Sequence, residues 1–185
     1  GAVRAPAETL LARRDALMER ISDLTPTRLR SVKTRCHGDL HLGHILVVEN
    51  DLVVINFEGD PSRPLSERRA KRCPLVDVAG MVRSFDQVAP AALELMCRDH
   101  PAERERLNEP LARWSSAITQ RFLAAYAQEA SGSPSHPESA QQARDLIRLF
   151  CLQKALEEIR HALRNRPQWA RVPIEGVLAL LDSAD

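Results

Sequence analysis

The residues able to do chemistry in this 185-residue sequence gather in one short segment. His37, Asp39, His41 and His44 lie within eight residues, in the run H-G-D-L-H-L-G-H. Imidazole nitrogens and carboxylate oxygens bind Zn²⁺, so one interpretation is a metal-dependent hydrolase, although the spacing matches no catalytic zinc signature. A carboxylate can also orient or deprotonate a hydroxyl group that attacks a nucleotide phosphate. Phosphoryl transfer is therefore the second interpretation.

A predicted β-hairpin follows this segment and brings more polar groups toward it. The runs 45–48 and 52–55 are β-branched and apolar, and Glu49-Asn50-Asp51 between them is typical of a turn. The second run leads into Asn56-Phe57-Glu58. Because a hairpin brings its two ends together, we expect the residues at those ends to line one cleft: Asp39, His44, Asn56 and Glu58.

The order of these groups favours phosphoryl transfer. In protein kinases the catalytic Asp precedes a metal-binding Asn in the same loop, and a second metal-binding Asp lies before a Phe. Here His44 follows Asp39 by five residues, and Asn56 precedes Phe57 after the hairpin. Both presumed metal positions therefore carry an unexpected residue.

Helices are predicted for most of the remaining chain. The apolar spacing predicts a helix over 7–24 that ends before Pro26, whereas the polar, proline-containing stretch 59–74 predicts a loop. Further helices are expected over 75–98 (with a break at Pro90), 102–130, 138–165 and 174–181. The expected fold is mostly α, with one small β-hairpin next to the catalytic loop and a single domain over residues 1–185.

Composition excludes several classes of protein. The 26 basic and 25 acidic residues give a net charge of +1, which argues against a nucleic-acid binder or a polybasic membrane binder. No apolar run approaches the roughly 20 residues of a membrane span, and the N-terminus lacks a signal-peptide pattern. The four cysteines form no C-x-x-C pair, so we expect reduced thiols and a cytoplasmic protein.

A long series of motifs closely resembles the catalytic block of bacterial maltokinases. These are H-G-D-L-H-L-G-H, then I-N-F-E-G-D-P-S-R-P-L-S-E-R-R, then P-L-V-D-V-A-G-M-V-R-S-F. The resemblance covers roughly residues 9 to 182, and the flanks look most like the maltokinase fused to trehalose synthase. It implies the helical C-terminal lobe of an aminoglycoside-phosphotransferase-like fold, related to protein kinases. It also implies ATP and Mg²⁺ as cofactors, and maltose converted to maltose 1-phosphate in trehalose and α-glucan metabolism.

The same resemblance assigns roles to individual residues. Asp39 matches the catalytic base. His44 stands where the family has Gln, and Asn56 where it has the metal-binding Asp. Glu58 matches the acid two residues further on, so that His44, Asn56 and Glu58 together form the cofactor-binding set. The remaining matches are structural: His37 and His41 brace the loop through hydrogen bonds, and Asp77 braces it from the following helix.

Two departures from the family pattern lower the expected activity. His44 offers Mg²⁺ a nitrogen and Asn56 offers it a neutral amide, which together weaken a magnesium site. The N-terminal lobe that clamps the nucleotide phosphates has no counterpart in the residues before Cys36. We therefore expect this chain by itself to be inactive. The rival interpretation is a degenerate, non-catalytic lobe that serves domain packing or sugar binding.

Overall fold

The computed structural model describes residues 3–182. The chain divides into two compact units, one made of residues 1–31 and 137–185 and the other of residues 32–136. Helices dominate both, and the described strands form a single two-stranded antiparallel sheet, so the expectation of a mostly α fold with one hairpin is confirmed. The prediction of a single domain stays a prediction. Within the described residues, no helix is both long and apolar enough to cross a membrane.

Among the described residues, four helices build the first unit: α1 (Arg4–Ala12), α2 (Arg14–Leu24), α6 (Ala140–Asn165) and α7 (Arg171–Asp182), with the 3-10 turn η3 (Pro167–Trp169) between the last two. The N-terminal helix predicted over 7–24 is in fact two helices that meet at Arg13. The break allows α1 to pack against α7 while α2 packs against α6. Their apolar faces enclose the buried residues Leu24, Leu152, Ala155 and Val177.

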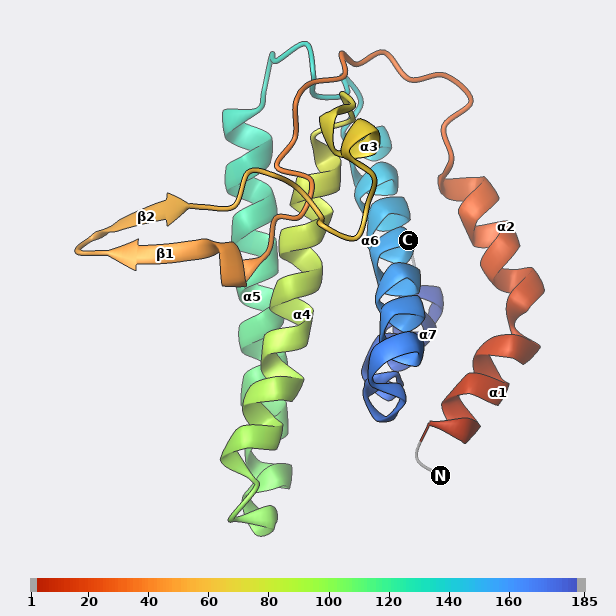
Figure 1. Cartoon of the computed structure of the whole chain (residues 1–185), viewed down its shortest axis with the longest axis vertical. Coiled ribbons are helices and arrows are strands. Elements are labelled where there is room, and N and C mark those ends of the chain that lie inside the picture. The colour runs from red at the N-terminus through yellow and green to blue at the C-terminus, as the bar shows by residue number, and fades with distance from the viewer. Residues whose placement is uncertain (1–2, 183–185) are drawn as a thin grey trace. The chain divides into compact units, whose positions relative to one another are not determined.

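The second unit is built on two long helices, α4 (Leu75–Met96) and α5 (Arg104–Glu129), which lie side by side (Figure 1). The 3-10 turn η2 (Pro101–Glu103) leads into α5. Buried residues of α4, including Leu75, Val78, Met81 and Phe85, form its core, and the Phe85 ring makes a T-shaped contact with Phe122 on α5, with 5.6 Å between the ring centroids. A different part of the α4 surface contacts the loop of residues 37–44.

Proline 90 does not end the helix, contrary to the predicted break. Pro90 lies inside α4, which continues to Met96. A proline within a helix removes one backbone hydrogen bond, but Pro90 is exposed, and Ala89 and Leu93 on either side are buried. The packing of α4 against α5 therefore keeps the helix continuous through this position.

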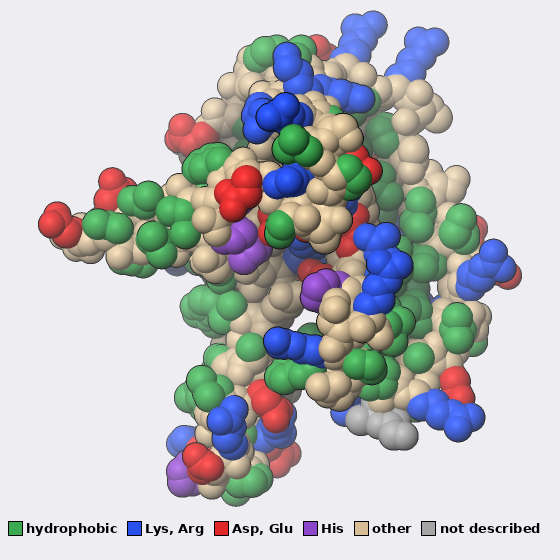
Figure 2. All heavy atoms as spheres, viewed as in Figure 1, with side chains coloured by type: hydrophobic (Ala, Val, Ile, Leu, Met, Phe, Trp, Pro, Cys, Tyr) green, Lys and Arg blue, Asp and Glu red, His purple; other side chains and the backbone are tan. Residues whose placement is uncertain are grey.

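The hairpin consists of β1 (Ile45–Val48) and β2 (Asp51–Val54), joined by a two-residue turn at Glu49-Asn50. Ile45 pairs with Val54, and Val48 pairs with Asp51, so β2 begins one residue earlier than predicted. The hairpin projects from the helices of its unit, with apolar side chains along it (Figures 1 and 2). The 3-10 turn η1 (Leu42–His44) precedes it. The stretch predicted as a loop over 59–74 contains the short helix α3 (Leu65–Arg69).

Candidate catalytic loop

The loop with the candidate catalytic residues, 37–44, is anchored at its start by an isolated β-bridge. Thr34 and Arg72 exchange two backbone hydrogen bonds of 2.9 Å each. Cys36 and Cys73 lie beside this bridge, and the Cys36 thiol donates to the carbonyl oxygens of Arg72 and Cys73 at 3.6 and 3.7 Å. The bridge therefore holds the start of the loop next to the start of α4.

The Asp77 carboxylate, in the first turn of α4, holds the loop backbone directly. Its Oδ2 accepts the His37 N–H at 2.7 Å, and its Oδ1 accepts the Gly38 N–H at 2.8 Å. Gly38 has a φ of +84°, a left-handed conformation that glycine adopts without steric cost. The two hydrogen bonds fix the direction of the chain just before Asp39.

Burial and the Asp77 charge also affect the thiol beside them. Burial, followed by the negative charge of Asp77, raises the pKa of Cys36 to about 11. Burial likewise raises the pKa of Cys73. Both cysteines therefore remain protonated thiols near neutral pH, and none of the four cysteines of the chain forms a disulfide in the structure.

His37 joins the loop to the hairpin. It is 6% exposed, and its Nε2 lies 2.7 Å from the carbonyl oxygen of Ile55. Because a carbonyl only accepts, Nε2 carries the proton, and Nδ1 is left to accept the Asp39 N–H at 3.3 Å. The His37 ring also packs against Phe57, with 5.0 Å between the ring centroids.

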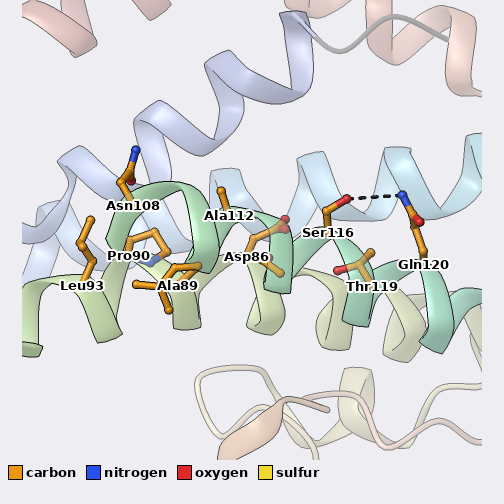
Figure 3. A pocket seen from close by; sticks show the side chains of 11 residues that line it. Asp86, Ala89, Pro90, Leu93, Asn108, Ala112, Ser116, Thr119 and Gln120 are labelled. Carbon is orange, nitrogen blue, oxygen red and sulfur yellow. Dashed lines mark hydrogen bonds between the residues drawn. The ribbon is translucent and has the colours of Figure 1, made fainter. Parts of the chain in front are cut away.

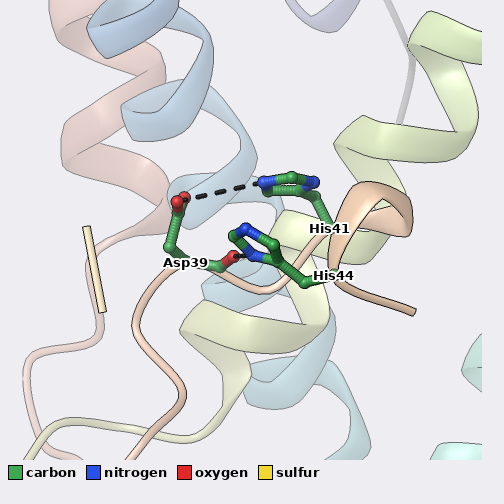
Figure 4. A group of neighbouring side chains, drawn as sticks. All are labelled: Asp39, His41 and His44. Carbon is green, nitrogen blue, oxygen red and sulfur yellow. Dashed lines mark hydrogen bonds and ion pairs between the residues drawn. The ribbon is translucent and has the colours of Figure 1, made fainter. Parts of the chain in front are cut away.

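Asp39, His41 and His44 form one cluster at the end of the loop (Figure 4). The Asp39 Oδ2 lies 3.9 Å from the His41 Nε2, and the Asp39 side chain is only 18% exposed. The two imidazole rings lie one against the other, with their centroids 3.9 Å apart. His44 Nδ1 is 2.9 Å from the Asp39 carbonyl oxygen, which connects the two ends of the cluster through the backbone.

Asn56 and Glu58 are placed differently from the members of this cluster. Ile55 N–H donates to the His44 carbonyl oxygen at 3.0 Å, so the backbone before Asn56 runs beside the loop. Asn56 itself adopts a left-handed φ of +63°, which asparagine tolerates better than most residues, and its side chain is exposed. Glu58 is also exposed, and its carbonyl oxygen accepts a hydrogen bond from Arg68. The described contacts thus join the hairpin to the loop through backbone groups and His37.

Two further residues of α4 position the loop, and the motif series did not single them out for this role. Ser84 Oγ accepts the Leu42 N–H at 3.0 Å. Gly80 faces the loop backbone so closely that a Cβ at this position would lie 2.4 Å from the Leu40 carbonyl oxygen. A glycine inside an otherwise regular helix is the sequence signal for such a close approach.

Replacing Gly80 with Ala should displace the loop. The added methyl group meets backbone rather than a flexible side chain, so Leu40 must move, at a cost of about 1–3 kcal/mol that exceeds the gain in helix propensity. Urea unfolding of the variant, compared with the parent, measures this cost. A variant more stable than the parent would show that the close contact does not constrain the loop.

A separate cavity of about 510 Å³ opens between α4 and α5 (Figure 3). Its walls are mostly apolar, and Ser116 and Gln120 of α5 are hydrogen-bonded to each other at 3.4 Å along one side. None of the predicted site residues lines it. The full lining is Asp86, Ala89, Pro90, Leu93, Asn108, Leu111, Ala112, Ser115, Ser116, Thr119 and Gln120.

Comparison with known proteins gives no match to any family model. The chain is 35% identical over 149 residues to a glucosamine kinase of Mycolicibacterium smegmatis and 30% identical over 150 residues to a glucosamine kinase of Streptacidiphilus jiangxiensis. These matches include 79% and 78% of this chain but only 34% and 31% of the relatives. The chain therefore spans about a third of the length of these curated relatives.

Solved structures agree with these sequence matches. One crystal form of a glucosamine kinase superimposes with a TM-score of 0.74 at 26% identity, over 97% of this chain and 42% of that one. A glucosamine kinase in complex with glucosamine, ADP and inorganic phosphate gives a TM-score of 0.69, also at 26% identity, over 97% of this chain and 41% of that one.

These relatives correct the sequence-based identification. The resemblance to bacterial maltokinases is wrong as an assignment of family and substrate, because the matched proteins are glucosamine kinases in both sequence and structure. Maltose as the acceptor and the fusion to trehalose synthase depend on that assignment, and the matched proteins do not support them. The matched proteins are themselves sugar kinases, and one of the matched structures is a complex with ADP.

Proposed function

We propose that this chain is the catalytic-loop lobe of an ATP-dependent amino-sugar kinase that phosphorylates glucosamine. The observation that carries the proposal is the 35% identity over 149 residues to a glucosamine kinase. The fold supports a kinase-like lobe, because nearly the whole chain superimposes on glucosamine kinase structures. Since the chain spans about a third of its curated relatives, the proposed activity is that of the complete gene product.

Asp39 is the proposed catalytic base. Its backbone N–H is held by His37, and the two residues before it are held by Asp77, so the chain enters the cluster in a fixed direction. The carboxylate remains partly exposed, as a group that receives a sugar hydroxyl must be. A carboxylate in this position orients the hydroxyl and accepts its proton as the phosphoryl group is transferred. His37 and Asp77 act as positioning residues.

The donors at the two positions expected to bind Mg²⁺ do not suit that ion. Mg²⁺ selects hard oxygen ligands in octahedral geometry, usually including carboxylates. His44 offers only a nitrogen, and its Nδ1 is already engaged with the Asp39 carbonyl oxygen. Asn56 offers a neutral amide on an exposed side chain. We therefore derive no catalytic step through a magnesium ion at His44 and Asn56.

A glucosamine-dependent release of ADP by the complete gene product tests the function. We expect turnover in the ordinary range of kinases, about 1–100 s⁻¹, with glucosamine as acceptor, and none without a sugar. N-acetylglucosamine is the matched control, because it differs only in the blocked amine and should be a much poorer substrate. A folded protein that releases no ADP with glucosamine would contradict the proposal and favour a non-catalytic lobe.

A further inference from the structure

The cluster of Asp39, His41 and His44 has the composition and dimensions of a transition-metal site. One possible ligand atom from each side chain lies within 4.8 Å of the corresponding atoms of the other two. All three side chains are partly buried. Tetrahedral zinc with bonds of about 2.0–2.1 Å places its ligand atoms roughly 3.3–3.4 Å apart. The present separation of 3.9 Å between the Asp39 Oδ2 and the His41 Nε2 is close to that value.

The hydrogen bonds of His44 prepare its ring to bind a metal. The Asp39 carbonyl oxygen can only accept, so the His44 Nδ1 carries the proton and Nε2 presents its lone pair. Metal-binding histidines in general donate their second ring N–H to a carbonyl or carboxylate, which fixes the tautomer and the orientation of the ring. Figure 4 shows the second His44 nitrogen on the side of the ring that faces the Asp39 carboxylate and His41.

His41 must change its tautomer before it can bind a metal ion through Nε2. Its Nδ1 accepts the Gly43 N–H at 3.0 Å, so the neutral ring carries its proton on Nε2, toward Asp39. An ion bound at Nε2 moves that proton to Nδ1. Gly43 is exposed, so its N–H can then donate to water at little cost. The rings of His41 and His44 lie against each other, and one ring nitrogen of each lies within 4.8 Å of the other and of an Asp39 carboxylate oxygen.

We propose that Asp39, His41 and His44 bind a divalent ion that prefers nitrogen ligands, with Zn²⁺ as the representative ion and a fourth position open to water. Imidazole and carboxylate ligands suit Zn²⁺ and Co²⁺ and are poorly suited to Mg²⁺. The inference goes beyond phosphoryl transfer, because it depends only on these three side chains. One consequence rests on the proposed function: an ion held by the Asp39 carboxylate prevents it from acting as a base, so Zn²⁺ should inhibit the kinase.

The cysteines are the main competing ligands for zinc in this chain. The raised pKa of Cys36 and Cys73 keeps both as thiols near neutral pH, and the thiolate is the form that binds metal. Cys97 and Cys151 are buried. The absorption spectrum of the Co²⁺ complex distinguishes a cysteine site from the Asp39, His41 and His44 site. Sulfur ligands add an intense near-ultraviolet charge-transfer band that nitrogen and oxygen ligands lack.

The test is calorimetric titration of the purified 185-residue chain with ZnCl₂ and with MgCl₂, in reductant and without nucleotide or sugar. We expect one Zn²⁺ per chain, far weaker binding of Mg²⁺, and a Co²⁺ complex without the sulfur band. His44→Gln, His41→Gln and Asp39→Asn should each weaken Zn²⁺ binding at least about 10-fold, since loss of even an outer partner costs about that much. His100→Gln, which removes an exposed histidine elsewhere in the same unit, should bind as the parent does.

Any one of three results would contradict the proposed site. The parent could fail to bind Zn²⁺, the three cluster variants could bind Zn²⁺ as well as the parent does, or the Co²⁺ complex could show the sulfur band. The parent measurements stand even if a variant fails to fold. Because no sugar or nucleotide is present, failure of this titration leaves the proposed kinase function intact, and failure of the ADP assay leaves the metal site intact.

Discussion

Replacing Asp39 with Asn in the complete gene product should lower kcat for glucosamine about 10²–10⁴-fold, the usual contribution of a positioned general base. The amide has nearly the same shape as the carboxylate but cannot accept the substrate proton. The loop should keep its conformation, because the Asp39 backbone N–H and C=O take part in hydrogen bonds that the substitution does not change. The measurement is steady-state ADP release at saturating ATP, with glucosamine varied.

The matched control is Asp99→Asn, which makes the same change at an exposed position between α4 and α5 and should leave kcat unchanged. A thermal melt of the Asp39→Asn variant checks that the fold is intact. If this variant keeps the kcat of the parent, Asp39 is not the base. A loss confined to KM would instead assign Asp39 to substrate binding.

The elements of the fold were largely predictable, because they depend on local patterns. Two β-branched apolar runs and the turn residues between them located the hairpin to within one residue, and helical spacing located the long helices. The errors arose where tertiary packing overrides local preference. Pro90 is tolerated because α4 is held by α5, and the break at Arg13 lets α1 and α2 contact different helices. Neither partner is visible in a window of sequence.

The chemistry of the site was predictable in part. The close spacing of Asp39 and the three histidines indicated the loop, because four ionisable side chains within eight residues are unusual in a segment that has only a structural role. Gly80 and Ser84 were not assigned to the site, since their roles depend on the distance between α4 and the loop backbone. The acceptor sugar was predicted wrongly. The motif series covers residues 37–44, 55–69 and 74–85. The choice of acceptor depends on the contacts that the folded pocket makes with the sugar, which a series of motifs does not describe.

Replacing Asp77 with Ala should destabilise the unit of residues 32–136 more than any surface substitution. The carboxylate accepts two short hydrogen bonds from the loop backbone, to His37 and Gly38. Hydrogen bonds to a charged group contribute about 1.5–3 kcal/mol each, and their donors would lose their partner inside the protein. We expect a loss of about 3 kcal/mol or more in the free energy of unfolding, which is a large share of the 5–15 kcal/mol typical of a domain.

Urea unfolding measures this loss in the free energy of unfolding, and two further variants serve as comparisons. Glu94→Ala removes another carboxylate from α4. The ion pair of Glu94 with Arg104 is exposed, and exposed pairs contribute only about 0–1 kcal/mol to stability. Asp77→Asn should fall between the two, because its Oδ1 still accepts one backbone N–H while its Nδ2 hydrogens oppose the other. If Asp77→Ala loses no more stability than Glu94→Ala, the two hydrogen bonds do not hold the loop, and the positioning role given to Asp77 is wrong.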